Sequence, residues 1–260
     1  MAEHEPHIRT HLADGALWIT LDRPDVHNAL DDELSAVLAE TVEQAGADDR
    51  VRVVVLTGAG AAFSAGADIS GEAPHERFDS STMDRANRII RAITGLAKPV
   101  VAAVNGVAAG VGCSAALAAD LAIAKESASF LLAFARIGLM PDGGSTATVA
   151  ASIGRARAMR MALLAEPLTA QEAYAAGLIA TVVPDDDFEA EVARVVRRLA
   201  AGPPLAFAAT KRAVNAATLL QLDPALEREK SGQTVLLRTT DFAEGLRAFT
   251  EKRLPDFRGE

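Results

Sequence analysis

Residues 98–124 read KPVVAAVNGVAAGVGCSAALAADLAIA, and this stretch decides the fold prediction. Its first part, KPVVAAVNG, is a continuous apolar run that is typical of a strand buried on both faces. A glycine turn follows, and a helix is expected from about Gly112. Backbone N–H groups in the first turn of a helix have no carbonyl partner within the helix, so they can hold negative charge. The stretch therefore predicts a strand, an amide-lined turn and a helix.

The same alternation of elements recurs upstream. Strands are expected in ALWITLDR (16–23) and VRVVVLTGAG (51–60), because both are rich in β-branched residues. The apolar spacing predicts a helix within residues 24–45 and a short one over 85–96, with a polar segment over 70–81 between them. Repeated alternation of strand and helix indicates an α/β core.

Downstream, the segment DLAIAKESASFLLAF (120–134) is interpreted as one or two further strands. From Ala147 onward the pattern is mostly helical, with prolines and glycines between the helices. The sequence thus predicts that helices end the chain, while periodicity alone leaves the winding of the sheets open.

Composition excludes several classes of protein. Half of the 260 residues are apolar, which is enough for a substantial core, and the formal charge of −9 opposes a broad grip on nucleic acid. The single cysteine, Cys113, cannot form an internal disulfide, and the first residues lack a signal-peptide core, so a cytoplasmic protein is expected. No apolar run approaches the roughly 20 residues of a membrane span. The sparse histidines offer no metal spacing, and no metal is expected.

Two predicted strands end in glycine turns, LTGAGAAFSAGAD (56–68) and VNGVAAGVGCS (104–114). The segment GVGCSA also matches the G-x-G-x-x-A form of a dinucleotide fingerprint. That fingerprint requires the turn to follow its strand immediately, whereas here residues 107–109 intervene. Dinucleotide binding is therefore a weak alternative.

A family resemblance rests on six segments in order. They are NAL (28–30), LTGAGAAFSAGADIS (56–70), residues 98–124 quoted above, IGLMPDGGST (137–146), GRARAMRMALLAEPLTAQEAYAAGLIATVVP (154–184) and FTEKRLPDF (249–257). Together they resemble the enoyl-CoA hydratase/isomerase (crotonase) family. The resemblance implies a crotonase-like spiral of ββα turns over residues 1–200 and a C-terminal helical oligomerisation region over 201–260. It also implies an acyl-CoA thioester substrate, no cofactor beyond the coenzyme A moiety of that substrate, and a homotrimer or dimer of trimers.

The resemblance assigns two backbone amides to catalysis. Family members stabilise a thioester enolate with two N–H groups, which correspond here to those of Ala67 and Val111. Fixed donors aimed at developing charge supply about 3 kcal/mol each in comparable sites. The alternative, on local sequence alone, is two ordinary tight turns.

The two glutamates of the family's hydratases are absent. Their positions correspond here to Ser114 and Phe134, and neither a hydroxyl nor a phenyl ring is a usable base near neutral pH. Asp142 instead matches the position of the proton-shuttling aspartate in the isomerase branch. The alternative for Asp142 is an N-cap, since a helix is expected from near Ser145. Ser114 is assigned a water-positioning role or, more simply, satisfaction of backbone groups.

Coenzyme A contacts are likewise carried over from the resemblance. The loop formed by Val26, His27, Asn28 and Ala29 and the backbone at Ala65, Asp68 and Ile69 correspond to the adenine and pantetheine cradle. Phe249 and Lys252 correspond to positions that reach coenzyme A, often from a neighbouring subunit. The alternative for Lys252 is a solvated charge at a helix end.

The leading functional hypothesis is an acyl-CoA isomerase with Asp142 as the single acid/base, moving a double bond or rearranging an oxidised ring. The alternatives are an enoyl-CoA hydratase using a Ser114-held water and a catalytically silent CoA-binding protein. Nucleophilic attack by Asp142, as in dehalogenating relatives, requires an aromatic cradle, and the only tryptophan, Trp18, is remote in sequence.

Overall fold

The computed structural model describes residues 7–71 and 74–260, whose strands form one large and one small sheet. In spatial order the large sheet contains β1 (Ile8–Ala13), β2 (Ala16–Leu21), β3 (Val53–Gly58), β5 (Val100–Val104), β7 (Leu121–Lys125) and β10 (Thr181–Val183). The small sheet contains β4 (Ala62–Ser64), β6 (Val107–Ala109), β8 (Ser129–Leu131) and β9 (Leu168–Thr169). The pairs β1–β2 and β8–β9 are antiparallel, and the other pairs are parallel.

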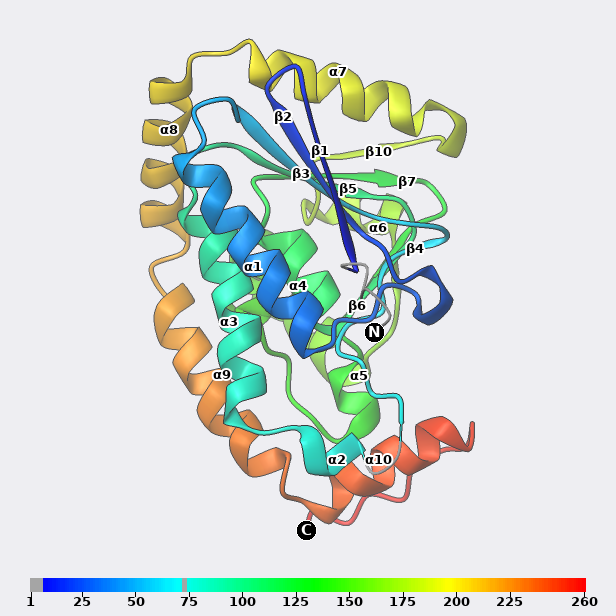
Figure 1. Cartoon of the computed structure of the whole chain (residues 1–260). Helices are drawn as coiled ribbons and strands as arrows, with labels where there is room; N and C mark the ends of the chain where they lie inside the picture. The colour runs from blue at the N-terminus through cyan, green and yellow to red at the C-terminus, as the bar shows by residue number, and fades with distance from the viewer. Residues whose placement is uncertain (1–6, 72–73) are drawn as a thin grey trace, which may run out of the picture.

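The chain winds between these sheets as a spiral. Three consecutive strand pairs, β3–β4, β5–β6 and β7–β8, each give one strand to the large sheet and the next to the small sheet. Helices follow each pair before the chain returns to the large sheet (Figure 1). The expected spiral of ββα turns is therefore confirmed.

Helices cover the sheets and complete the chain. The α-helices are α1 (Asp32–Ala47), α2 (Pro74–Arg77), α3 (Ser80–Gly95), α4 (Gly110–Ala118), α5 (Ser145–Leu164), α6 (Ala170–Ala176), α7 (Phe188–Ala200), α8 (Pro204–Thr218), α9 (Leu222–Leu236) and α10 (Thr240–Thr250). Short 3₁₀ turns are η1 (Pro24–Val26), η2 (Ala133–Ile137) and η3 (Asp185–Asp187). In Figure 1, α8 and α9 run down one side of the molecule and α10 crosses its lower end.

The two faces of the large sheet pack into different cores. In β3, Val54 and Leu56 join the main core with α1 and α3, whereas Val53 and Val55 pack against α7. The same alternation divides β5. A strand with both faces covered needs apolar residues throughout, which is why these runs carried so clear a signal in the sequence.

Several element boundaries differ from the sequence prediction. The helix expected over 85–96 begins at Ser80, where Asp79 and Thr82 form a capping box, and the helix expected from Gly112 begins at Gly110. The 120–134 segment contains two strands, β7 and β8. Strands β1, β4, β6, β9 and β10 were not predicted, and β4 and β6 lie in the segments interpreted as glycine turns. The polar 70–81 segment lies partly outside the described residues.

Candidate active site

Asn28 fixes the loop that forms one wall of the site. This buried residue has a left-handed backbone conformation, and its Nδ2 donates to the carbonyl oxygens of Ala59 (2.9 Å) and Ala62 (2.8 Å). Ser64 Oγ donates in turn to the Asn28 carbonyl oxygen at 2.8 Å. These bonds fasten the loop after η1 to the turn and strand of β4.

Ala67 pairs with this loop in a way that orients its own amide. Leu30 N donates to the Gly66 carbonyl oxygen (2.7 Å), and Asp68 N donates to the Leu30 carbonyl oxygen (2.9 Å). In a parallel bridge of this kind, the residue between the two bonded neighbours turns its N–H and C=O the other way. The Ala67 N–H therefore points away from Leu30, while Ala67 itself lines the main cavity.

Val111 supplies a second free amide close by. It is the second residue of α4, so its N–H precedes the first intrahelical hydrogen bond. The two turns touch at glycines, because a Cβ on Gly66 (φ +94°) would lie 2.8 Å from the Ala109 carbonyl oxygen and 3.4 Å from Gly110 Cα. Glycine is thus required for the approach of the two turns, and Ala67 and Val111, one residue beyond the touching glycines, both line the cavity.

The segment that carries Asp142 packs directly on α4. A Cβ on Gly143 (φ +61°) would lie 2.8 Å from Ser114 Cβ and 3.6 Å from Val111 Cγ2. Ser114 Oγ donates to the Asp142 carbonyl oxygen at 2.8 Å. The fold therefore gathers the Ala67 turn, the start of α4 and Asp142 into one contiguous region.

The carboxyl group of Asp142 is buried and half satisfied. The residue is 5 % exposed, and its Oδ2 accepts a hydrogen bond from Gln233 Nε2 at 2.8 Å. Its Oδ1 is buried without a hydrogen-bond partner among the described residues. Desolvation, with a smaller contribution from the charge of Glu229, raises the pKa of Asp142 to about 7, although the Gln233 bond opposes the shift. A carboxyl with this pKa can both take and return a proton near neutral pH.

The N-cap interpretation of Asp142 is wrong. Gly144 is the N-cap residue of α5, and as a glycine it has no side chain that could accept hydrogen bonds from the first amides of the helix. The amides are instead satisfied by Glu229 of α9, which accepts from Gly144 N (2.7 Å), Thr146 N (3.0 Å) and Thr146 Oγ1. Burial is the main cause that raises the pKa of Glu229. A cap supplied from another helix leaves the Asp142 side chain free to face the cavity.

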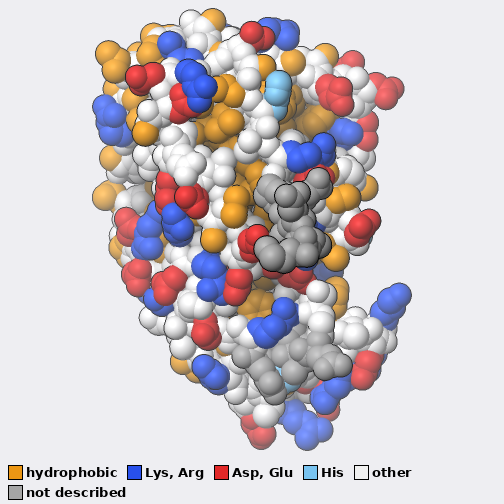
Figure 2. All heavy atoms as spheres, viewed as in Figure 1, with side chains coloured by type: hydrophobic (Ala, Val, Ile, Leu, Met, Phe, Trp, Pro, Cys, Tyr) orange, Lys and Arg blue, Asp and Glu red, His pale blue; other side chains and the backbone are white. Residues whose placement is uncertain are grey.

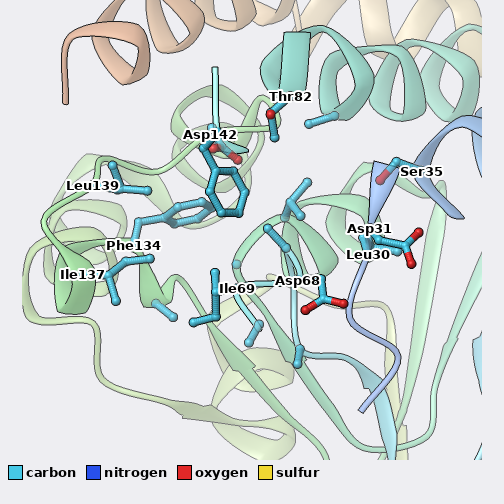
Figure 3. A pocket seen from close by; sticks show the side chains of 18 of the residues that line it. Leu30, Asp31, Ser35, Asp68, Ile69, Thr82, Phe134, Ile137, Leu139 and Asp142 are labelled. Atoms are coloured by element: carbon cyan, nitrogen blue, oxygen red, sulfur yellow. The ribbon is translucent and has the colours of Figure 1, made fainter. Parts of the chain in front are cut away.

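A cavity of about 570 Å³ connects these groups. Its lining includes Ala67, Val111, Phe134 and Asp142, together with apolar side chains from α3, η2 and α10. Figure 3 shows Asp142 and Phe134 on one side and the carboxylates of Asp31 and Asp68 on the other. The space thus has an apolar end with one carboxyl and a more polar end near the loop after η1.

Arg23 links the segments that form the polar end of the cavity. Its guanidinium contacts Asp31 Oδ2 (3.1 Å) and Asp68 Oδ2 (2.9 Å) and donates to the Ala29 carbonyl oxygen (2.7 Å). Burial opposes ionisation of Asp68, but hydrogen bonds from Ser70 and then from Arg23 keep the pKa of Asp68 below its usual value. Arg23 therefore joins the segments around the entrance and is not itself free for an anionic ligand.

The residues predicted to contact coenzyme A are only partly gathered at this cavity. His27, Ala65, Asp68, Ile69 and Phe249 line it. Val26, in η1, is half buried and Ala29 is buried, and neither contributes to the lining. Lys252 follows α10 in a left-handed conformation and is exposed outside the cavity, as the solvated-charge alternative expects.

Ser114 and Phe134 differ in their relation to the cavity. Phe134 lies in its wall, whereas Ser114 is fully buried and absent from the lining. The Ser114 hydroxyl is occupied by the Asp142 carbonyl oxygen and, at 3.4 Å, by that of Gly110. Its observed contacts are therefore those of a residue that satisfies backbone groups.

Two polar residues that hold the Asp142 segment, Glu229 and Gln233, were not predicted from the sequence. Both lie on the buried face of α9, four residues apart, in line with Leu222 and Leu226. The available signal was a Glu and a Gln at positions where the helical period places core residues. Such side chains need buried partners, and therefore mark a polar contact within the core.

The described residues contain no cluster of His, Cys, Asp and Glu suited to a metal ion. Over residues 7–71 and 74–260 there is also no helix with the length and apolar character to cross a membrane. Figure 2 shows Lys and Arg side chains interspersed with Asp and Glu over one face, rather than gathered by sign.

Comparisons with known proteins identify the family and the fold of this chain. The family model described as enoyl-CoA hydratase/isomerase matches residues 12–260. The chain is 39 % identical to 1,2-epoxyphenylacetyl-CoA isomerase of Escherichia coli, over 97 % of this chain and 98 % of that protein. It is 44 % identical to a probable enoyl-CoA hydratase of Rhodobacter capsulatus, over the same shares of the two chains.

A solved structure, that of an enoyl-CoA hydratase from Mycobacterium avium subsp. paratuberculosis, superposes with a TM-score of 0.92 at 50 % identity, covering 97 % of this chain and 98 % of that one. The fold and site define a crotonase-type acyl-CoA enzyme. This chain belongs to the enoyl-CoA hydratase/isomerase family, and its substrate is a coenzyme A thioester. Relatives with hydratase and isomerase names are similarly close.

Proposed function

We propose that the protein is an acyl-CoA isomerase of the single-aspartate branch, which moves a double bond or rearranges an oxidised ring through a thioester enolate. The observation that carries this proposal is Asp142, which lines an apolar cavity and whose buried Oδ1 has no hydrogen-bond partner among the described residues. The relative named 1,2-epoxyphenylacetyl-CoA isomerase is consistent with it.

In the proposed reaction, ionised Asp142 removes a proton from the carbon α to the thioester carbonyl, or from the γ carbon of an α,β-unsaturated thioester. The electron pair of the broken C–H bond moves onto the carbonyl oxygen, which becomes an enolate and accepts hydrogen bonds from Ala67 N and Val111 N. The same carboxyl, now protonated, returns the proton to a different carbon. The pair of electrons leaves the oxygen, the C=O bond re-forms, and atoms and charge balance without water.

Hydration of a double bond is the second candidate, because a relative at 44 % identity is named a probable enoyl-CoA hydratase. It requires a group that holds the attacking water. Ser114 does not line the cavity, its hydroxyl donates to a backbone carbonyl, and Phe134 has no polar group. These contacts favour proton transfer within the substrate over addition of water.

A direct comparison of two substrates tests the proposal. A β,γ-unsaturated acyl-CoA should be converted to its α,β isomer, whereas crotonyl-CoA should give little 3-hydroxyacyl-CoA at the same enzyme concentration. Chromatography and mass spectrometry separate the two products. Rapid hydration of crotonyl-CoA would overturn the isomerase assignment, and binding of both thioesters without turnover would support a catalytically silent protein.

A further inference from the structure

Helix α9 contacts the segment around Asp142 through two side chains that lie one helical turn apart. Gln233 contacts Met140 and Asp142, and Glu229, one turn earlier, contacts Gly144 and Thr146. The helix lies tightly against the segment, because a Cβ on Gly232 would lie 2.5 Å from Met140 Sδ. Two side chains of one helix thus hold the residues on both sides of the carboxyl.

The contacts of Gln233 fix which end of its amide faces Asp142. Its Oε1 accepts from Met140 N at 3.2 Å. A backbone N–H can only donate, so the amide oxygen must face Met140 and the NH₂ group must face Asp142. The opposite rotamer would place two donors against each other. Gln233 therefore presents a donor to Asp142 Oδ2 at all times.

A carboxyl oxygen that accepts this bond cannot also present a proton to Gln233. The protonated form of Asp142 must then carry its proton on Oδ1, the oxygen without a protein partner. Resting on the proposed acid/base function of Asp142, we infer that Gln233 is a positioning residue that confines the transferred proton to Oδ1. Glu229 supports it by fixing the backbone of the following turn.

Glu229 is the charged group whose field shifts the pKa of Asp142. Helix α4 carries no charged residue, and the charges of α5 begin at the exposed Arg155. Several charged side chains on the other neighbouring elements have partners of their own, and Arg228, on α9 itself, acts on Glu229. Three of these side chains form ion pairs: Arg85 of α3 with Asp32, Lys230 of α9 with Asp84, and Glu244 of α10 with Arg253. Two others donate to backbone carbonyl oxygens: Arg136 of η2 to that of Ala165, and Arg77 of α2 to that of Ser70.

The two α9 residues should shift the titration of Asp142 in opposite directions. Gln233→Met removes a donor to the carboxylate and should raise the midpoint by about 0.5–1 pH unit. Glu229→Gln removes a neighbouring negative charge and should lower it. If Gln233 and Glu229 only filled space, neither substitution would shift the titration midpoint of Asp142. The matched controls are Gln221→Met and Glu227→Gln, exposed residues of the same part of the chain, which should leave it unchanged.

The midpoint is measured on the substrate-free protein by ¹³C NMR of labelled aspartate carboxyls, with Asp142→Asn identifying the resonance. Solvent deuterium incorporation into a β,γ-unsaturated acyl-CoA is followed in parallel as a function of pH. In Gln233→Met, kcat should fall about 10–100-fold, because the reacting oxygen is displaced, with KM changed less than about threefold. The pH at which the rate rises should move with the NMR midpoint.

Equal midpoints in wild type, Gln233→Met and Glu229→Gln would overturn the inference. If Gln233→Met does not fold, Gln233→Glu keeps the acceptor for Met140 and should raise the midpoint further, because two carboxyls then share one proton. An unchanged midpoint in that variant would overturn it equally. Absence of exchange in wild type would instead refute the proposed function, while the substrate-free titration would still test the role of Gln233.

Discussion

At the scale of single residues, Asp142 imposes a pH-dependent cost on folding. Its pKa is raised from 3.8 to about 7 in the folded protein, mainly by burial. Below about pH 4 both folded and unfolded chains hold the proton. Between that pH and about 7 only the folded chain does, so stability is lost as pH rises and levels off above pH 7. If Asp142 acts as the proposed acid/base, that function is maintained at the expense of stability at neutral pH.

Asp142→Asn should expose this cost, since the amide stays neutral at every pH. The free energy of unfolding of the variant, relative to wild type, should increase by on the order of 2–3 kcal/mol between pH 5 and pH 8. Urea unfolding of the ligand-free proteins at both pH values measures it. A difference that is the same at pH 5 and pH 8 would mean that the folded and unfolded pKa values of Asp142 are alike.

At the scale of elements, the two glycine turns must touch for their amides to act together. Gly66→Ala would place a Cβ 2.8 Å from the Ala109 carbonyl oxygen in a left-handed conformation, so the Ala67 turn must move. We expect kcat to fall about 10²–10³-fold, comparable with the loss of one oxyanion donor. Steady-state kinetics with a β,γ-unsaturated acyl-CoA measure it.

Gly95→Ala is the matched control, because nothing lies within 4 Å of its added Cβ at the end of α3. This variant should keep the wild-type rate. Equal rates in Gly66→Ala and wild type would show that the contact between the turns does not position the reacting amides.

Elements also show where sequence reading succeeds. The β3 and β5 runs were predicted because both faces are covered, whereas β1 is an edge strand in which Ile8 alone is buried. Because several consecutive side chains of this strand are polar and exposed, its sequence shows no alternation of apolar and polar residues.

At the candidate site, the position of Asp142 was predicted from the family motif. Glu229 and Gln233 lie at core positions of α9, which marks a buried polar contact, but no local pattern identifies the partner, since Gln233 and Asp142 are 91 positions apart.

At the scale of the whole molecule, the expected trimer or dimer of trimers is a proposal that concerns the C-terminal end. Phe249 is 61 % exposed on α10 yet lines the cavity, and Leu254 is 90 % exposed. Deleting residues 249–260 should weaken coenzyme A binding and reduce the oligomer together. Light scattering and calorimetry with coenzyme A measure both. A truncated chain that stays oligomeric and binds normally would contradict this role.

Lys252 offers a finer test of the same proposal. It lies outside the cavity of its own chain, so a contribution to binding would come from a contact made in the assembly. Lys252→Ala should then raise KM severalfold with little change in kcat, because a remote charge acts equally on the ground and transition states. A selective loss of kcat would count against that role.

The central claim, that Asp142 is the single acid/base, is tested most directly by α-proton exchange in deuterated water. Asp142→Asn retains the size of the side chain and an acceptor for Gln233 but removes the base. The rate of deuterium incorporation into a β,γ-unsaturated acyl-CoA, followed by mass spectrometry at pH 8, should fall roughly 10²–10⁴-fold while binding persists. Exchange at the wild-type rate in this variant would contradict the account.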